Sequence, residues 1–154
     1  KSQILRLIDS ETCAKNIETD NDKITKTDFA ESEKQDREYL QLCRPYLIKC
    51  ISENFKKYNT NGIAFGNFWF QQYHNHDMHD WHIHKNCHWT HIYYLELLDI
   101  AEITQIKSLK NNSLIDFNAK EGDIVSFPSF LYHKSPRIDS NYRKTIISFN
   151  SNFI

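Results

Sequence analysis

The fold is decided by the stretch Gly122-Asp-Ile-Val-Ser-Phe-Pro128, which continues as Ser-Phe-Leu-Tyr-His133. Gly and Asp favour a turn, the Ile-Val-Ser-Phe run favours extended backbone, and proline favours the end of a strand. The segment is therefore predicted to form a turn, a strand and a proline corner. Such a corner can return the chain beside an earlier strand, which makes His133 a candidate member of a site.

Short strands are predicted on both sides of this segment, because runs of β-branched and aromatic residues are bounded by polar turns. The chain has only three glycines, so Asn, Asp and Ser must form most of the turns. Several short strands joined in this way are typical of an antiparallel sandwich or barrel. The predicted strands are Ile63–Tyr73, Thr90–Leu98, Ala101–Ser108, Ser113–Phe117, Asp123–Phe127 and Lys144–Asn150.

The N-terminal part, residues 1–61, is predicted to contain two short strands, Ile4–Ile8 and Ile24–Phe29, followed by a helix. Between Gln35 and Tyr58, apolar residues recur at steps of three and four, which gives the helix one apolar face. Pro45 falls inside this stretch, so either the helix kinks or two shorter helices form. We expect a single domain over residues 1–154, in which this helical layer packs outside one sheet of a β core at residues 62–154.

Charge and composition exclude several classes of partner. The net charge of −1, from 19 basic and 20 acidic side chains, argues against nucleic-acid binding. No apolar run reaches the roughly 18–20 residues that span a bilayer, which argues against a membrane partner. The cysteines are scattered without close pairs, which predicts reduced thiols and a cytoplasmic location. They are Cys13, Cys43, Cys50 and Cys87.

Histidines gather in one part of the chain: seven of the eight lie between positions 74 and 91. On a strand, His82 and His84 would point to the same face, roughly 6–7 Å apart at their Cα atoms, close enough to share one metal ion. His133 is the candidate for the third ligand. Imidazole suits iron, zinc, copper or nickel, so the residues alone do not choose the metal. The remaining five are interpreted as surface or hydrogen-bonded core residues, namely His74, His76, His79, His88 and His91.

From Asn67 onward the sequence resembles the small 2-oxoglutarate/iron(II)-dependent oxygenases. The resemblance covers a little over half of the chain, and it rests on the order of several short motifs. It implies a double-stranded β-helix, the cupin-like or jelly-roll fold. The matching stretches are Trp69-Phe-Gln-Gln-Tyr73, Trp81-His-Ile-His84, Trp89-Thr-His-Ile-Tyr-Tyr-Leu95, Gly122-Asp-Ile-Val-Ser-Phe-Pro-Ser-Phe-Leu-Tyr-His133 and Arg143-Lys-Thr-Ile-Ile-Ser-Phe-Asn150.

The resemblance also implies roles for single residues. His82 matches the first metal ligand and His133 the distal one. Arg143, ten residues later, matches the arginine that pairs with the far carboxylate of 2-oxoglutarate, and Thr145 matches a hydroxyl on the same carboxylate. Because Arg143 and Thr145 are two residues apart, they would point to the same side of a strand. A guanidinium can bind a carboxylate through two hydrogen bonds. Tyrosine hydroxyls could add contacts to this cosubstrate; the candidates are Tyr73 and Tyr93.

One residue departs from the usual pattern of two histidines and one carboxylate, because His84 stands at the acidic position. Three readings follow. His84 ligates and gives a three-histidine site, as in cupins; or it turns away and leaves a coordination position open; or a nearby acid replaces it. Asp80 and Glu96 are the acids considered for that last case.

These patterns lead to one main hypothesis and two alternatives. The main one is an oxygenase with Fe(II) and 2-oxoglutarate, hydroxylating an unidentified small molecule or protein side chain; zinc or nickel could replace iron in the purified protein. The second is a three-histidine cupin-type metalloenzyme without 2-oxoglutarate, for which Arg143 would face solvent or a structural acid. The third is a non-catalytic metal-binding cupin module. A homodimer is compatible with the fold class.

Overall fold

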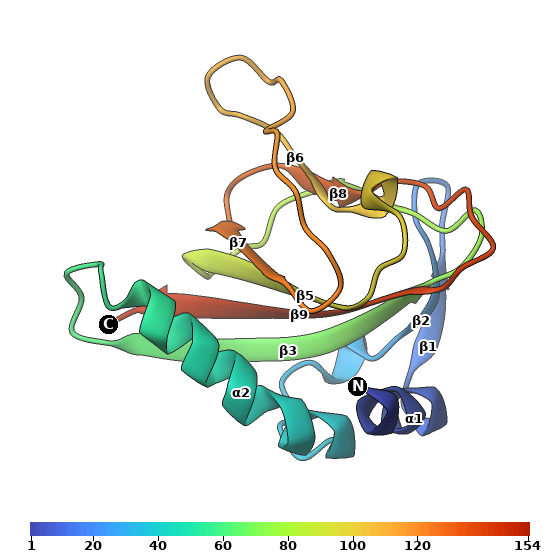
Figure 1. The fold of residues 1–154 in the computed structure, drawn as a ribbon, viewed down its shortest axis with the longest axis horizontal. Helices are drawn as coiled ribbons and strands as arrows, with labels where there is room; N and C mark the ends of the chain where they lie inside the picture. The colour runs from blue at the N-terminus through green and yellow to red at the C-terminus, as the bar shows by residue number, and fades with distance from the viewer.

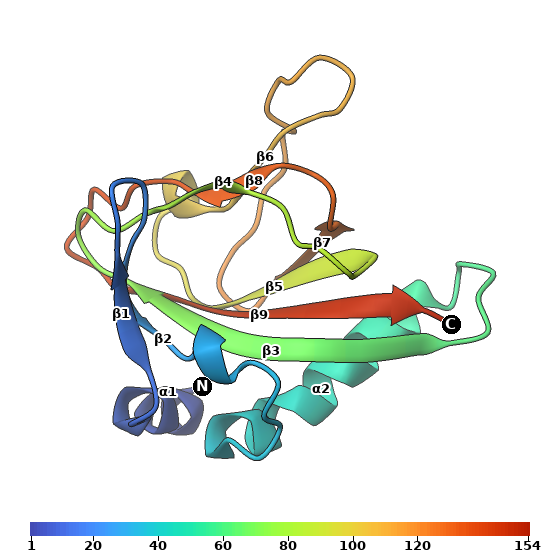
Figure 2. The same cartoon turned by 180° about the vertical axis from the view of Figure 1, so that it is seen from behind.

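The computed structural model describes all 154 residues and places nine strands in two antiparallel sheets (Figure 1). The large sheet has the order β1-β2-β3-β9-β5-β7, and the small sheet has the order β4-β8-β6. The two sheets face each other, as Figure 2 shows from behind. The strands are β1 (Lys15–Glu18), β2 (Lys23–Thr27), β3 (Ile63–Tyr73), β4 (His79–His82), β5 (Trp89–Glu96), β6 (Gln105–Ile106), β7 (Ile124–Pro128), β8 (His133–Ser135) and β9 (Lys144–Phe153).

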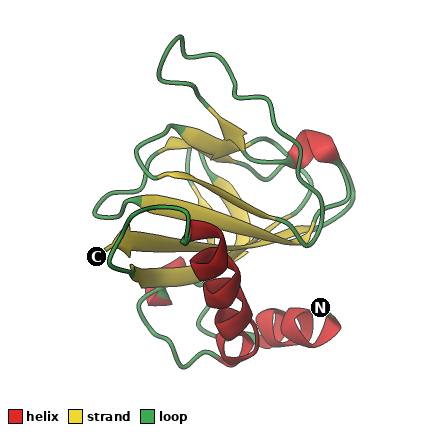
Figure 3. Ribbon diagram, turned by 60° about the vertical axis from the view of Figure 1, so that its left-hand side comes forward, coloured by secondary structure: helices red, strands yellow, loops and turns green.

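Two helices, α1 (Ser2–Ser10) and α2 (Glu38–Phe55), cover the outer face of the large sheet (Figure 3). The apolar residues that recur every three or four positions form the buried face of α2, from Leu40 to Phe55. This face packs on side chains of β3, β5 and β9, including Phe68 and Phe149, whose rings stack 4.7 Å apart. Neither helix is long and apolar enough to cross a bilayer.

A second core fills the space between the two sheets. Tyr94 and Ile146 of the large sheet meet Ile106 of the small one there, together with Phe127 and Ile138. All five side chains are buried. A mainly β, double-stranded β-helix with an N-terminal helical layer is therefore the fold, as predicted.

The alternation of side chains along β9 decides which residues face the space between the sheets. Ile147 and Phe149 belong to the core beneath the helices. Ile146 faces the opposite way, into the core between the sheets. Because successive residues of a strand point to opposite faces, even-numbered residues of β9 face inward and odd-numbered ones face the helices.

The apolar run Ile4–Ile8 was predicted to form a strand, and this prediction is wrong. Ile4–Ile8 lies in α1, where Ile8 is fully buried against α2. A five-residue apolar run fits either structure, and tertiary packing decides between them. Lys26 also stabilises the helical form, because its ammonium donates to the last carbonyls of α1, on Ile8 and Asp9, at 2.7 Å each.

Other boundaries differ from the prediction. Pro45 lies inside a single helix, α2, rather than between two helices. Ala101–Ser108 forms a 3₁₀ turn (Ile100–Glu102) followed by the two-residue strand β6. Ser113–Phe117 is not a strand; only an isolated bridge between Lys107 and Leu114 remains there. Strand β1 was missed, because polar residues dominate it.

A candidate metal centre

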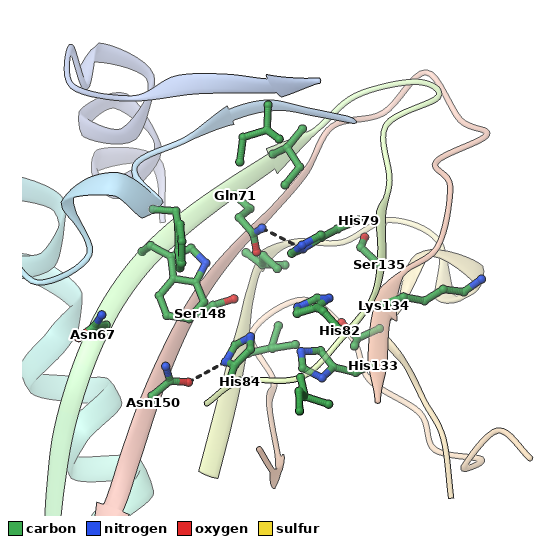
Figure 4. Close-up of a pocket in the computed structure, with 18 of the residues that line it drawn as sticks. Asn67, Gln71, His79, His82, His84, His133, Lys134, Ser135, Ser148 and Asn150 are labelled. Atoms are coloured by element: carbon green, nitrogen blue, oxygen red, sulfur yellow. Dashed lines mark hydrogen bonds between the residues drawn. The ribbon is translucent and has the colours of Figure 1, made fainter. Parts of the chain in front are cut away.

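Three histidines meet between the two sheets (Figure 4). His82 ends β4 and His133 begins β8, and the two residues lie directly opposite each other in the small sheet. His84 follows two residues after β4, where its backbone N–H donates to the carbonyl of Ser129 at 3.0 Å. The nitrogen atoms available as ligands on the three rings lie within 4.8 Å of one another.

Hydrogen bonds fix which nitrogen of each ring is free. The Nδ1 atom of His82 lies 2.7 Å from the carbonyl oxygen of Asp80, and that of His133 lies 3.0 Å from the carbonyl oxygen of Leu131. A carbonyl only accepts, so both Nδ1 atoms carry the proton and both Nε2 atoms keep a free lone pair. The Nδ1 atom of His84 lies 2.8 Å from Oδ1 of Asn150. Hydrogen bonding of the second ring nitrogen in this way is typical of histidines that bind metals.

Burial keeps these rings neutral. It lowers the pKa of His84 to about 4 and the pKa of His133 to about 2, and it lowers the pKa of His82 as well. A protonated imidazole has no lone pair for a metal, whereas a neutral one has. At neutral pH all three rings are therefore ready to bind a cation.

The donor set fits a divalent transition-metal ion. Bonds of about 2.1 Å to one ion would place neighbouring nitrogens about 3.0–3.4 Å apart, whereas the ligand nitrogens here lie within 4.8 Å of one another. The two acids considered as substitutes do not join the group. Asp80 contributes its backbone carbonyl to His82. Glu96 is bound to Arg143 and Thr145 on the helix side of the sheet.

The three rings line a pocket of about 360 Å³. Trp69, Ile92 and Ile146 give it apolar walls, and Tyr73 and Ser135 contribute to its lining as well. Of the tryptophans near the histidines in sequence, only Trp69 lines it. The predicted cosubstrate contact of Tyr73 is compatible with this position. Tyr93 instead packs against the core beneath the helices, and we correct that expectation.

Arg143 and Thr145 do not line the pocket. The guanidinium of Arg143 binds Glu96 at 2.7 and 3.1 Å and Asp9 at 2.8 Å, and the Thr145 hydroxyl donates to Glu96. Thr145 is odd-numbered on β9 and faces the helices. We therefore correct the expectation that these two residues bind a cosubstrate beside the metal: in this structure, acidic side chains on the outer face hold them.

Lys144, which lies between Arg143 and Thr145 in the sequence, faces inward and is fully buried. Its Nζ atom donates to the carbonyl of Glu102 at 2.6 Å and to the hydroxyl of Ser135 at 2.7 Å, and it lies 5.0 Å from the centre of the Tyr73 ring. Burial lowers the pKa of Lys144 to about 7. Sequence reasoning missed this residue: it shares its strand face with Ile146, but Ile146 and Ile147 are both apolar, so the alternation alone does not show which face is turned inward.

His79 is a second residue that the sequence reasoning missed, since it was interpreted as lying outside the site. Its ring stacks on His82 with the ring centres 3.8 Å apart, and it lines the pocket. Its Nδ1 atom accepts from the Gln71 amide at 3.4 Å. Among the other histidines, His91 is a core residue as predicted: it lies between the hydroxyls of Ser126 and Ser151 on the helix side.

Solved structures with a similar fold are found, whereas comparison of the sequence alone finds no relative. No family model matches the chain, and no curated protein matches it. An oxidoreductase of the 2OG-Fe(II) oxygenase family from Burkholderia pseudomallei is similar with a TM-score of 0.74, at 8% identity over 98% of this chain and 77% of that one. A prolyl-4-hydroxylase from Pseudomonas putida is similar with a TM-score of 0.64, at 10% identity over 99% of this chain and 84% of that one.

The non-heme alpha-ketoglutarate-dependent epimerase SnoN from nogalamycin biosynthesis is similar with a TM-score of 0.74, at 7% identity over 97% of this chain and 69% of that one. At such low identity these likenesses establish the fold alone. The chain therefore has the double-stranded β-helix fold of 2OG-Fe(II) oxygenases, and its histidines form a group that can hold a metal ion.

Proposed function

We propose that this protein is an iron(II)- and 2-oxoglutarate-dependent oxygenase that hydroxylates a small molecule or a protein side chain. The observation that carries the proposal is the meeting of three neutral imidazoles in one pocket of a double-stranded β-helix, two of which have a backbone carbonyl at Nδ1 and so a free Nε2 atom. When bound, the iron supplies the dioxygen chemistry with which enzymes of this kind oxidise C–H bonds.

His82, His84 and His133 would hold the metal. Three protein ligands leave further coordination positions for the cosubstrate and for oxygen, which separates this arrangement from a closed structural site. Trp69, Ile92 and Ile146 would exclude water from the reacting atoms.

Lys144 is the residue that we propose as the anchor for the far carboxylate of 2-oxoglutarate, in place of Arg143. In its neutral form its amine has two N–H groups, which match the two acceptors at Glu102 and Ser135. An incoming carboxylate would favour the charged form, whose third N–H could then donate to the ligand. Tyr73 and Ser135 touch Lys144 and also line the pocket, so they connect the lysine with the space beside the metal.

One observation favours a second candidate, a three-histidine metalloenzyme that does not use 2-oxoglutarate. Arg143 is bound to Glu96 and Asp9, as that hypothesis expects. The two candidates differ in whether the pocket binds 2-oxoglutarate, since both require the metal.

The test is an anaerobic titration of the iron(II)-loaded protein with 2-oxoglutarate, followed by the visible charge-transfer band of the chelated metal. We expect a band in the wild type and in Arg143→Met, and a weakened band in Lys144→Met. A buried lysine replaced by methionine keeps its volume and loses only its polar group, so the variant should fold. Stoichiometric iron without any band would reject 2-oxoglutarate and favour the second candidate.

A further inference from the structure

His84 differs from the other two histidines in what holds its ring. Backbone carbonyls bind the Nδ1 atoms of His82 and His133, so no substitution at the partner residue removes those acceptors. The Nδ1 atom of His84 has only side-chain partners, Oδ1 of Asn150 at 2.8 Å and Oγ1 of Thr90 at 3.0 Å. The geometry of this ligand therefore depends on the identity of two other residues.

Asn150 and Thr90 are placed together by the register of the large sheet. They lie directly opposite each other on β9 and β5. Thr90 is fully buried, and its hydroxyl has two acceptors other than the imidazole, Oγ of Ser129 at 3.1 Å and Oδ1 of Asn150 at 3.4 Å. When its single proton points to either of them, its lone pairs can accept from Nδ1 of His84. The carbonyl of Ser129 in turn accepts from the backbone N–H of His84. Backbone and ring of His84 are thus held by the same small network.

A carboxylate at the position of His84 would offer two equivalent oxygens, whereas an imidazole binds a metal through Nε2 only when its proton sits on Nδ1. Two acceptors at Nδ1 favour that tautomer. They also keep the ring plane oriented, as hydrogen-bond acceptors behind metal-bound histidines commonly do.

We propose that Asn150 and Thr90 are positioning residues that hold His84 as the Nδ1–H tautomer, with Nε2 turned toward His82 and His133, and so complete a three-histidine metal site. The inference rests on the metal binding in the proposed function and not on its cosubstrate. Of the three readings of His84, the proposal adopts the first, in which His84 is a ligand. It also implies that the ion and its three protein ligands together carry the net charge of the free ion, because all three ligands are neutral.

Asn152 provides a matched control. It lies two residues beyond Asn150 on the same face of β9, and its Oδ1 accepts from the backbone N–H of His88 at 2.9 Å rather than from a ring of the site. Asn150→Leu and Asn152→Leu therefore make the same chemical change on one strand, and only the first removes an acceptor from His84. Thr90→Val removes the second acceptor and keeps the side-chain shape.

The first readout is the affinity of the protein for Co²⁺, measured by its visible absorption in competition with a chelator. We expect Asn150→Leu to weaken binding by about 10–100-fold. Asn150→Asp should bind at least as tightly as the wild type, because a carboxylate is also an acceptor. Asn152→Leu should bind as the wild type does. Equal affinities of Asn150→Leu and Asn152→Leu would overturn the proposal, as would a His84→Ala variant that binds Co²⁺ as tightly as the wild type.

The second readout is the tautomer of His84 in the metal-free protein, from ¹⁵N chemical shifts of the histidine rings. A role confined to general stability would not move this signal. We expect the Nδ1–H form in the wild type and a mixture of both forms in Asn150→Leu. An Nε2–H form in the wild type would refute the proposal. A protein that fails to bind 2-oxoglutarate while both readouts behave as expected would reject the oxygenase and leave this inference standing.

Discussion

Lys144→Met should change how the stability of the protein depends on pH. Burial lowers the pKa of Lys144 from 10.5 to about 7, so the folded state disfavours the ammonium form. A difference of this size corresponds to about 5 kcal/mol when the ammonium must be buried. Between these two pKa values the unfolded chain binds a proton that the folded chain does not, and the free energy of unfolding therefore rises with pH.

The measurable part of this effect lies between pH 7 and 9. Over that interval the contribution of Lys144 to the free energy of unfolding should rise by about 2–3 kcal/mol. Other groups titrate as well. For example, burial raises the pKa of the Cys43 thiol to about 12, so above about pH 8.5 this group lowers the free energy of unfolding as the pH rises. Subtracting the curve of Lys144→Met from that of the wild type removes these shared contributions.

The assay is urea unfolding of both proteins in the absence of metal at pH 7, 8 and 9. The wild type should gain stability relative to Lys144→Met with each step in pH. Parallel curves would refute the reasoning, because they would mean that Lys144 is already protonated in the folded state. Added 2-oxoglutarate should reduce the pH dependence of the difference if its carboxylate binds the ammonium form.

Three substitutions test other parts of the structure. His133→Ala removes one of three ligands and should weaken Co²⁺ binding more than tenfold, as measured by chelator competition; unchanged affinity would exclude His133 from the site. Arg143→Met should leave 2-oxoglutarate binding unchanged and lower the free energy of unfolding by about 1–3 kcal/mol, because Glu96 loses its guanidinium partner and keeps only the Thr145 hydroxyl; a loss of cosubstrate binding would restore the role predicted from the sequence. Asp28→Asn leaves the buried guanidinium of Arg37 without its counter-charge and should lower the free energy of unfolding by about 3–5 kcal/mol, measured in urea; less than about 1 kcal/mol would contradict it.

The β core could be predicted because its strands are long enough to show their pattern. Ile63–Tyr73 was predicted with the bounds that the structure has. The His82 and His84 pair and the return of His133 were also predictable, because a histidine repeat with a spacing of two and a proline corner are local signals. The structure brings these three residues together, although His84 lies beyond the end of its strand.

Register was not predictable in the same way. A shift of one residue on β9 exchanges the inward and outward faces, and the loop before Lys144 determines that shift. The resemblance placed Arg143 ten residues after His133, whereas the residue that faces inward comes eleven residues after it. The position of His79 depends similarly on the register shift between His79 and His82 in the pairing of β4 with β8, which the sequence does not reveal.

The most direct test of the metal centre is a crystal structure of the iron(II)-loaded protein grown without oxygen, with an anomalous difference map at the iron edge. One peak per chain is expected, about 2.1 Å from Nε2 of each of His82, His84 and His133. A peak bound to His82 and His133 but not to His84, or a peak elsewhere in the chain, would contradict the three-histidine site.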